Sequence, residues 1–329
     1  MPDSPAIQIA DVLGAARLLD GVAVRTPLIE NQILNERIGG RVLIKFEGAQ
    51  HTGSFKFRGA YNRLARLSPS ERTAGVVAWS SGNHAQGVAC AARMLGIPAT
   101  IVMPADAPAI KAANTCALGA RIIPYDRLTE SREEIATRLA RDSGATLLPS
   151  FDDPHVMAGQ GTVGLEILEQ AKQARANVEQ ILVCCGGGGL ISGIATAVKA
   201  SRPDVAIYSV EPDGYDDTAR SLASGVRERA MPGATSICDA LLAPSPGILT
   251  FPINHAWLAG GLAVSDAEVR AAMRFAFSTL KIVAEPGGAV ALAALLAGKA
   301  PSCPGDRVVV ISGANVDPDL FAAVISETD

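Results

Sequence analysis

The chain has 329 residues, of which 48% are apolar and 19% charged, so it can bury a large core in one large or about two ordinary domains. Its net charge of -4 provides no basic excess, which argues against nucleic acid or an anionic membrane surface as a partner. We find no signal-peptide pattern, no apolar run of about 18 residues and no C-x-x-C pair among the six cysteines, and therefore expect a cytoplasmic protein with reduced thiols.

Apolar runs of strand length alternate with helical patterns along the chain. In its first half the sequence predicts strands at 41–46, 75–79, 97–103, 121–125 and 146–149, and helices at 11–19, 58–67, 85–95, 107–118 and 130–141. In its second half it predicts strands at 180–185, 205–210 and 307–311, and helices at 161–173, 190–200, 266–280 and 288–296. Such alternation is typical of βαβ units in a parallel sheet. A polar turn at 149–154 suggests a large domain formed by 1–45 and 150–329 and a small domain formed by 46–149.

A single lysine, Lys56, lies between two phenylalanines in the run TGSFKFRGA at 52–60, directly after a predicted strand. An ammonium beside aromatic rings and small residues loses part of its hydration, which favours the neutral amine. A neutral amine can attack a carbonyl and form a Schiff base. For an isolated lysine, a surface position with its stem over a phenylalanine is the commoner explanation. Three later loops favour the covalent role.

Four glycines, Gly186, Gly187, Gly188 and Gly189, follow an apolar strand and precede a helix. Without Cβ atoms, successive backbone N–H groups can converge on an anion, and the helix N-terminus adds positive partial charge. The run matches neither the G-x-G-x-x-G pattern of dinucleotide sites nor the P-loop, which requires a lysine. It therefore predicts a site for a cofactor with one phosphate, with a glycine-rich packing turn as the alternative.

The second loop, Ser80, Ser81, Gly82, Asn83 and His84, also lies between a strand and a helix. Its small hydroxyls and backbone amides can hold a carboxylate, and the asparagine can donate to a phenolate oxygen. Helix capping alone would also explain serine and asparagine here. The histidine is either a ligand or a core residue.

The third loop begins at Ser312, directly after the last predicted strand. In a parallel sheet, ligands bind beyond the carboxyl ends of the strands. A serine at such a position can donate a hydrogen bond to a heterocyclic nitrogen.

These features, in this order, resemble the fold-type II pyridoxal-phosphate enzymes, and within them the threonine dehydratase and serine racemase branch. The resemblance extends from Thr26 to Asp317, nearly the whole chain. It implies an α/β fold similar to the tryptophan synthase β chain, with two domains that are each an open, mostly parallel sheet flanked by helices. It also implies a homodimer or a higher homo-oligomer.

The resemblance assigns a role to each loop. Lys56 carries pyridoxal 5'-phosphate, Phe55 packs on the pyridine ring, Asn83 binds the ring oxygen, Ser312 faces the ring nitrogen, Gly186 to Gly189 hold the phosphate, and Ser80, Ser81, Gly82, Asn83 and His84 receive the substrate carboxylate. A serine at the ring nitrogen leaves the pyridine neutral, which favours loss of a β-substituent. The implied reaction removes the Cα proton with the lysine and expels the β-hydroxyl group, with the cofactor phosphate as candidate acid. A 2-oxo acid and ammonia result.

Several substrates are compatible with these residues. The resemblance favours L-threonine and L-serine, as in short catabolic dehydratases without a regulatory domain. Arg132 matches an arginine of 3-hydroxyaspartate dehydratases and can pair with a second carboxylate, although it can also be a surface partner of Glu133. Ser81 matches the serine that serves racemases on the face opposite the lysine. A non-catalytic pyridoxal-phosphate-binding protein is the alternative of another class.

The acidic segment 211–217 predicts a possible Mg²⁺ or Ca²⁺ site, because carboxylates and backbone carbonyls lie close together in it. The racemase-like relatives imply Glu211, the carbonyl of Tyr215 and Asp217 as ligands. An acidic, solvated turn is the alternative. Glu285 matches a family position near the active site and has no assigned role.

Overall fold

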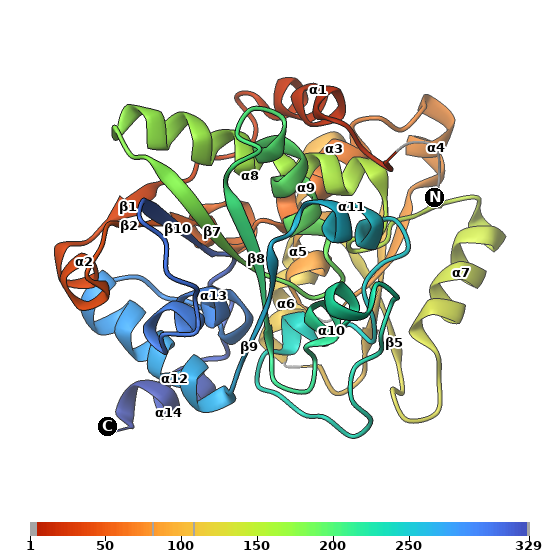
Figure 1. The fold of residues 1–329 in the computed structure, drawn as a ribbon. Coiled ribbons are helices and arrows are strands. Elements are labelled where there is room, and N and C mark those ends of the chain that lie inside the picture. Colours follow the sequence, from red (N-terminus) through yellow and green to blue (C-terminus); the bar gives the residue numbers. More distant parts are fainter. Residues whose placement is uncertain (1–4, 81, 108, 328–329) are drawn as a thin grey trace.

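The computed structural model describes residues 5–80, 82–107 and 109–327, which build two sheets (Figure 1). The larger sheet has six strands in the order β1 (Leu28–Glu30), β2 (Val42–Phe46), β10 (Asp306–Ile311), β7 (Val178–Cys184), β8 (Ala206–Pro212) and β9 (Gly260–Val264). Neighbouring strands are parallel, except that β1 pairs antiparallel with β2. The smaller sheet is fully parallel, in the order β5 (Arg121–Tyr125), β4 (Ala99–Pro104), β3 (Val76–Trp79) and β6 (Thr146–Leu147).

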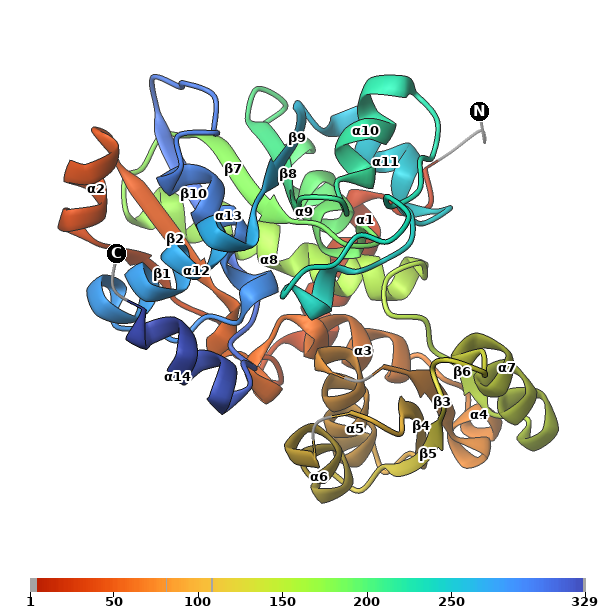
Figure 2. The same cartoon turned by 90° about the horizontal axis from the view of Figure 1, so that it is seen from below.

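Helices cover both sheets. Those between the strands of the smaller sheet or next to it are α3 (Lys56–Leu64), α4 (Pro69–Ala74), α5 (Asn83–Leu95), α6 (Ala109–Ala117) and α7 (Arg132–Ser143). The others are α1 (Ile9–Leu19), α2 (Gln32–Ile38), α8 (Pro154–Gln173), α9 (Gly189–Lys199), α10 (Asp217–Ser224), α11 (Thr250–Trp257), α12 (Asp266–Phe275), α13 (Pro286–Leu296) and α14 (Pro318–Ser326). Figure 2 shows α3 to α7 gathered on one side of the molecule, around the smaller sheet.

Each sheet carries its own core. On the smaller sheet, Val76 and Ala78 pack with α3 and α5, whereas the intervening Val77 packs with α7 on the other face. This is the period of two that a strand covered on both faces produces. On the larger sheet, α13 is buried almost all round, and the apolar centre of β7 is fully buried.

The predicted α/β class with mostly parallel sheets is confirmed. Strands within 76–147 form the smaller sheet, and strands within 28–46 and 178–311 form the larger one. We therefore propose domain limits near residues 46 and 150. No helix in the described ranges is long and apolar enough to cross a bilayer.

Most predicted helix starts differ from the observed ones by one or two residues, and two of the differences concern the site. The helix α3 begins at Lys56 rather than at residue 58, so the lysine itself occupies the first helical position. The helix α8 begins at Pro154 rather than at 161, because Asp153 accepts a hydrogen bond from the Val156 amide and caps it. Its glycines lowered the helical signal, but tight packing requires them: a Cβ on Gly159 would lie 2.7 Å from the Cα of Gly59 in α3.

Several elements were not expected from the sequence, namely β1, α2, α4, α10, α11, α14 and β9. The predicted helix 266–280 is α12 followed by a π-helical turn at Ala276–Leu280. All of these except β9 are short or border irregular segments, where local patterns are weakest.

Candidate active site

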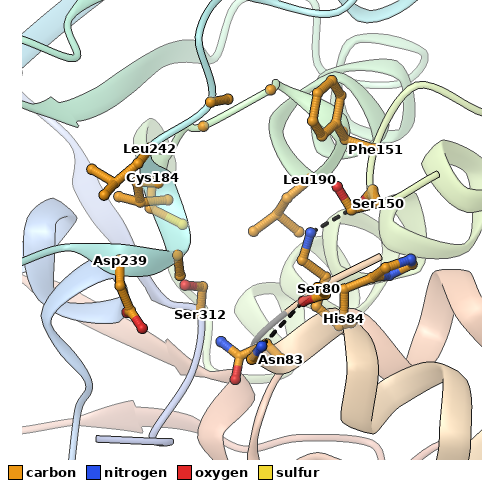
Figure 3. A pocket seen from close by; sticks show the side chains of 18 of the residues that line it. Ser80, Asn83, His84, Ser150, Phe151, Cys184, Leu190, Asp239, Leu242 and Ser312 are labelled. Atoms are coloured by element: carbon orange, nitrogen blue, oxygen red, sulfur yellow. Dashed lines mark hydrogen bonds between the residues drawn. The ribbon is translucent and has the colours of Figure 1, made fainter. Parts of the chain in front are cut away.

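One cavity lies beyond the carboxyl ends of β3, β7 and β10, the strands that precede the three predicted loops. Its lining contains most of the predicted site residues: Phe55, Lys56, Ser80, Gly82, Asn83, His84, Arg132, Gly186, Gly187, Gly188, Gly189 and Ser312. Figure 3 shows Ser80, Asn83 and His84 from the smaller sheet together with Cys184 and Ser312 from the larger one. Residue Ser81 lies outside the described residues. The predicted metal ligands lie elsewhere, at the end of β8 and the start of α10.

The lysine loop is attached to the segment after β10. The amide of Phe55 donates to the Ser312 carbonyl at 3.1 Å, and Ser54 forms a β-bridge with Gly313. Just before them, Thr52 has φ 59°, a left-handed conformation that is rare for a β-branched residue. The loop is therefore held in a strained, defined conformation directly before the lysine.

The Lys56 amine is more easily deprotonated than an ordinary lysine. Its Nζ donates to the Ser150 carbonyl at 3.0 Å and lies 5.1 Å from the centre of the Phe55 ring. Burial lowers the pKa of this amine to about 8, although the Glu285 carboxylate opposes the shift. Only one of the flanking rings faces it, since Phe57 is buried in the core beside His51 and Tyr61.

Three of the four glycines, Gly187 to Gly189, leave no room for side chains, and Gly186 leaves little. A Cβ on Gly187 would overlap the Phe151 ring, and one on Gly189 would lie 2.9 Å from the Phe151 Cβ. At Gly188 the backbone has φ +92°, and a Cβ would lie 2.6 Å from Asn254. The run thus serves close packing on one side while its backbone lines the cavity on the other, where a phosphate site stays a prediction.

A second layer of contacts supports this glycine loop. The Thr250 hydroxyl donates to the Gly187 carbonyl at 2.6 Å. The Asp152 carboxylate accepts hydrogen bonds from the amides of Ile248, Leu249 and Thr250 at 2.9, 2.8 and 3.3 Å, at the start of α11. Asp152 and its neighbour Phe151 therefore connect the loop after β6 to the glycines.

The start of α5 faces the cavity with its free backbone N–H groups. His84 is 3% exposed, and its Nε2 lies 3.1 Å from the Leu148 carbonyl. A carbonyl only accepts, so Nε2 carries the hydrogen. Burial, helped by the Lys56 charge, lowers the His84 pKa to about 3. The imidazole is therefore neutral and both a core and a cavity residue.

Ser312 is buried and lies near the Cys184 thiol at the end of β7. Burial raises the pKa of this thiol to about 11, so it stays protonated and uncharged near pH 7. The groups near the predicted position of the cofactor's ring nitrogen, the Ser312 hydroxyl and the Cys184 thiol, are therefore uncharged.

Arg132 begins α7 and reaches the cavity from the smaller sheet. Its Nε pairs with Glu133 at 3.0 Å, and its side chain is 43% exposed. The surface ion pair and the position at the cavity, which the sequence offered as alternatives, thus coexist.

Several lining residues were not among the predicted site residues: Trp79, Ser150, Phe151, Cys184, Leu190 and Asp239 to Ala243. Ser150 and Phe151 belong to a loop that directly follows a predicted strand, a signal that could have identified them. The family resemblance predicts the segment 236–242 beside the cofactor, and its residues 239–242 do line the cavity.

The two acidic side chains of the predicted metal site are buried. Glu211 accepts hydrogen bonds from the amides of Thr218 and Ala219 at 2.9 and 2.8 Å, whereas Asp217 Oδ2 has no hydrogen-bond partner. Burial raises the pKa of both carboxyls, that of Asp217 to about 7. Among the described residues, no group of three His, Cys, Asp or Glu side chains could hold a metal.

A family model described as pyridoxal-phosphate dependent enzyme matches residues 19–313. An L-threo-3-hydroxyaspartate ammonia-lyase of Pseudomonas sp. is 46% identical over 316 residues, which cover 96% of this chain and 97% of the relative. An L-threonine ammonia-lyase of Thermotoga maritima is 42% identical over 98% of this chain and 79% of its own. The solved structure of maize serine racemase has a TM-score of 0.91 and 37% identity, covering 97% of this chain and 96% of that one.

Proposed function

Because the chain belongs to the family of pyridoxal-phosphate-dependent enzymes, we propose that it is an ammonia-lyase acting on a β-hydroxy amino acid. It removes the β-hydroxyl group and yields a 2-oxo acid and ammonia. The observation that carries the proposal is the shared cavity, in which the amine of Lys56 meets the glycine loop and Ser312.

The residues of the cavity fit pyridoxal phosphate. The glycine backbone and the start of α9 offer N–H groups to a phosphate, the Lys56 amine has a pKa suited to imine formation, and Ser312 offers a neutral hydroxyl. When bound, the cofactor supplies an electron sink for the charge that develops at the substrate Cα.

The protein contributes binding, orientation and proton transfer. The amine of Lys56, partly neutral near pH 8, can accept the Cα proton, as a general base requires. The free amides at the start of α5 can hold the substrate carboxylate. The neutral His84, whose Nε2 hydrogen is used by the Leu148 carbonyl, is unsuited to protonate the departing hydroxyl group.

Among the candidate substrates, a 3-hydroxyaspartate is favoured by Arg132. This residue lines the cavity from the opposite lobe to Ser312, and its planar, charged guanidinium suits a second carboxylate. L-threonine and L-serine, the first expectation from the sequence, lack that carboxylate and would leave this arginine to Glu133 and solvent.

The test compares 2-oxo acid release from L-threonine, L-serine and both 3-hydroxyaspartate diastereomers, in the native protein and in Arg132→Ala. We expect a preference for a dicarboxylic substrate that falls about tenfold or more in the variant, since a charge-assisted pair is removed. Equal loss on threonine and hydroxyaspartate would contradict the role of Arg132. Binding of the cofactor without turnover of any of the four would instead support the non-catalytic alternative.

Racemisation of serine is a second candidate, supported by the maize structure and by the match of Ser81 to the racemase serine. Removing and returning the Cα proton on opposite faces requires two groups, whereas elimination requires only the lysine. Chiral analysis of recovered serine checks it: Ser81→Ala should stop formation of D-serine and leave elimination intact.

For the second site we propose that Mg²⁺ or Ca²⁺ binds Glu211, the Tyr215 carbonyl and Asp217. The Oδ2 atom of Asp217 supports this, because it is buried without a hydrogen-bond partner among the described residues and a cation would supply one. Removal of the cation by a chelator should then lower the melting temperature of the native protein but leave that of the Asp217→Asn variant unchanged.

We further propose that the protein is a homodimer, and light scattering would measure its oligomeric state. A cytoplasmic location stays a prediction.

A further inference from the structure

Three polar side chains from distant parts of the chain form a hydrogen-bonded chain beside the cavity. Asn83 Nδ2 donates to Glu285 Oε1 at 2.6 Å, and Asn315 Nδ2 donates to Asn83 Oδ1 at 2.7 Å. The same Nδ2 of Asn315 donates to the carbonyl of Thr52 at 2.7 Å, and the Asn315 backbone amide donates to Glu285 Oε2 at 3.1 Å. Asn83 and Glu285 are 7% and 3% exposed, so these bonds are largely shielded from water.

Donor and acceptor chemistry allows only one orientation of both amides. The carbonyl of Thr52 can only accept, so Asn315 must turn its Nδ2 towards it, and the second hydrogen of that nitrogen serves Asn83. Asn83 must therefore direct its oxygen to Asn315 and its nitrogen to the Glu285 carboxylate. A flipped Asn83 would set oxygen against carboxylate and nitrogen against nitrogen, leaving shielded groups unpaired.

This arrangement leaves one N–H of Asn83 unused by the two partners. Asn83 and Glu285 both line the cavity, and Figure 3 shows Asn83 at its edge together with Ser312. We propose that Glu285 and Asn315 are positioning residues that make Asn83 present an N–H donor, and not its carbonyl, to the ring oxygen of pyridoxal phosphate. The inference rests on the proposed function, since it needs that cofactor in this cavity.

The network also connects parts of the molecule that lie far apart in the sequence. Asn83 begins α5 beside the smaller sheet, Glu285 precedes α13, and Asn315 follows β10 of the larger sheet. Through Thr52 it reaches the strained turn before Lys56. One set of bonds thus orients the oxygen-binding amide and anchors the lysine loop.

The test uses Glu285→Gln and Asn315→Asp, with Asn62→Asp as the matched control. Asn62 is a buried asparagine whose Nδ2 also donates to a backbone carbonyl, that of His155 at 2.7 Å, but it does not line the cavity. A glutamine at 285 can accept from only one of its two donors with its oxygen, and an aspartate at 315 has no hydrogen for Thr52 or Asn83.

Two measurements separate positioning from general stability: titration of each protein with pyridoxal phosphate, and the absorbance spectrum of the bound cofactor. We expect Glu285→Gln and Asn315→Asp each to bind pyridoxal phosphate at least about tenfold more weakly than the native protein, because one shielded polar group is left unsatisfied. We also expect intensity to move from the long-wavelength band to the short-wavelength band, because a ring oxygen without its donor retains a proton. Asn62→Asp should keep the native spectrum even if its melting temperature falls.

If Glu285→Gln showed the same spectrum and the same affinity for pyridoxal phosphate as the native protein, the inference would be wrong. Should Asn315→Asp fail to fold, the result for Glu285→Gln is sufficient by itself. An equal spectral change in Asn62→Asp would overturn it too, because the effect would then be general. A native protein that takes up no pyridoxal phosphate would overturn the proposed function itself, which is a different result from an unchanged variant.

Discussion

The Lys56 amine illustrates how a single residue acquires its chemistry from its surroundings. Its pKa of about 8 results chiefly from burial, so a large fraction is neutral at pH 8, against less than about 1% for a lysine at the usual value near 10.4. We predict that labelling of Lys56 by an amine-reactive reagent in cofactor-free protein rises with pH around 8, and not around 10.4. Peptide mapping across a pH series measures it.

The Lys56→Arg variant is the control, because it should lose that labelled peptide and no other. A midpoint near 10 for Lys56 would show that the amine is well hydrated, and the argument from desolvation would then be wrong.

At the scale of elements, the start of α11 supports the glycine loop through Asp152. Replacing Asp152 by Ala removes three hydrogen bonds from backbone amides to a carboxylate. We predict that the variant binds pyridoxal phosphate about tenfold or more weakly, while binding of pyridoxal, which has no phosphate, changes little. Comparative titration with the two compounds measures the difference.

Asp153→Ala provides the neighbouring control, since Asp153 caps α8 by accepting from the Val156 amide and has no bond to α11 among those described. It should lower stability by about 1 kcal/mol without selectivity for the phosphate. If Asp152→Ala lost affinity equally for pyridoxal phosphate and pyridoxal, Asp152 would not support a phosphate site in the glycine loop.

At the scale of the whole molecule, a buried charge cluster joins the larger sheet to the helix that carries the lysine. Arg58 of α3 binds Glu47 at 2.8 Å and Glu166 of α8 at 2.6 Å, and Lys45 of β2 binds Glu166 at 2.6 Å. We predict that Arg58→Met lowers the free energy of unfolding by about 3–5 kcal/mol, because it leaves the Glu47 carboxylate without its ionic partner in a shielded site. Urea unfolding followed by tryptophan fluorescence measures it.

The double variant Arg58→Met with Glu47→Gln should recover part of that loss, since one unpaired charge is removed as well. If the single variant lost less than about 1 kcal/mol, as exposed ion pairs do, the cluster would be hydrated rather than shielded.

Sequence patterns alone identified the strand-and-helix series and the three loops, because each is local. A strand followed by small residues and a helix places its loop at the carboxyl edge of a parallel sheet, wherever the strand lies in that sheet. That is why Lys56, Asn83, Gly188 and Ser312 could be grouped before the structure was known. Local patterns failed where packing overrides them, as in the glycine-rich start of α8.

Only the tertiary structure decided which groups act on these residues. Asn83 and Glu285 are 202 positions apart in the chain, and no periodicity or spacing connects them with Asn315. The same holds for the shielding that lowers the pKa of Lys56, and for Phe57, which turned away from the amine into the core. Residue type and spacing determine which chemistry is available, whereas desolvation and donor–acceptor matching depend on neighbours that only the folded chain brings together.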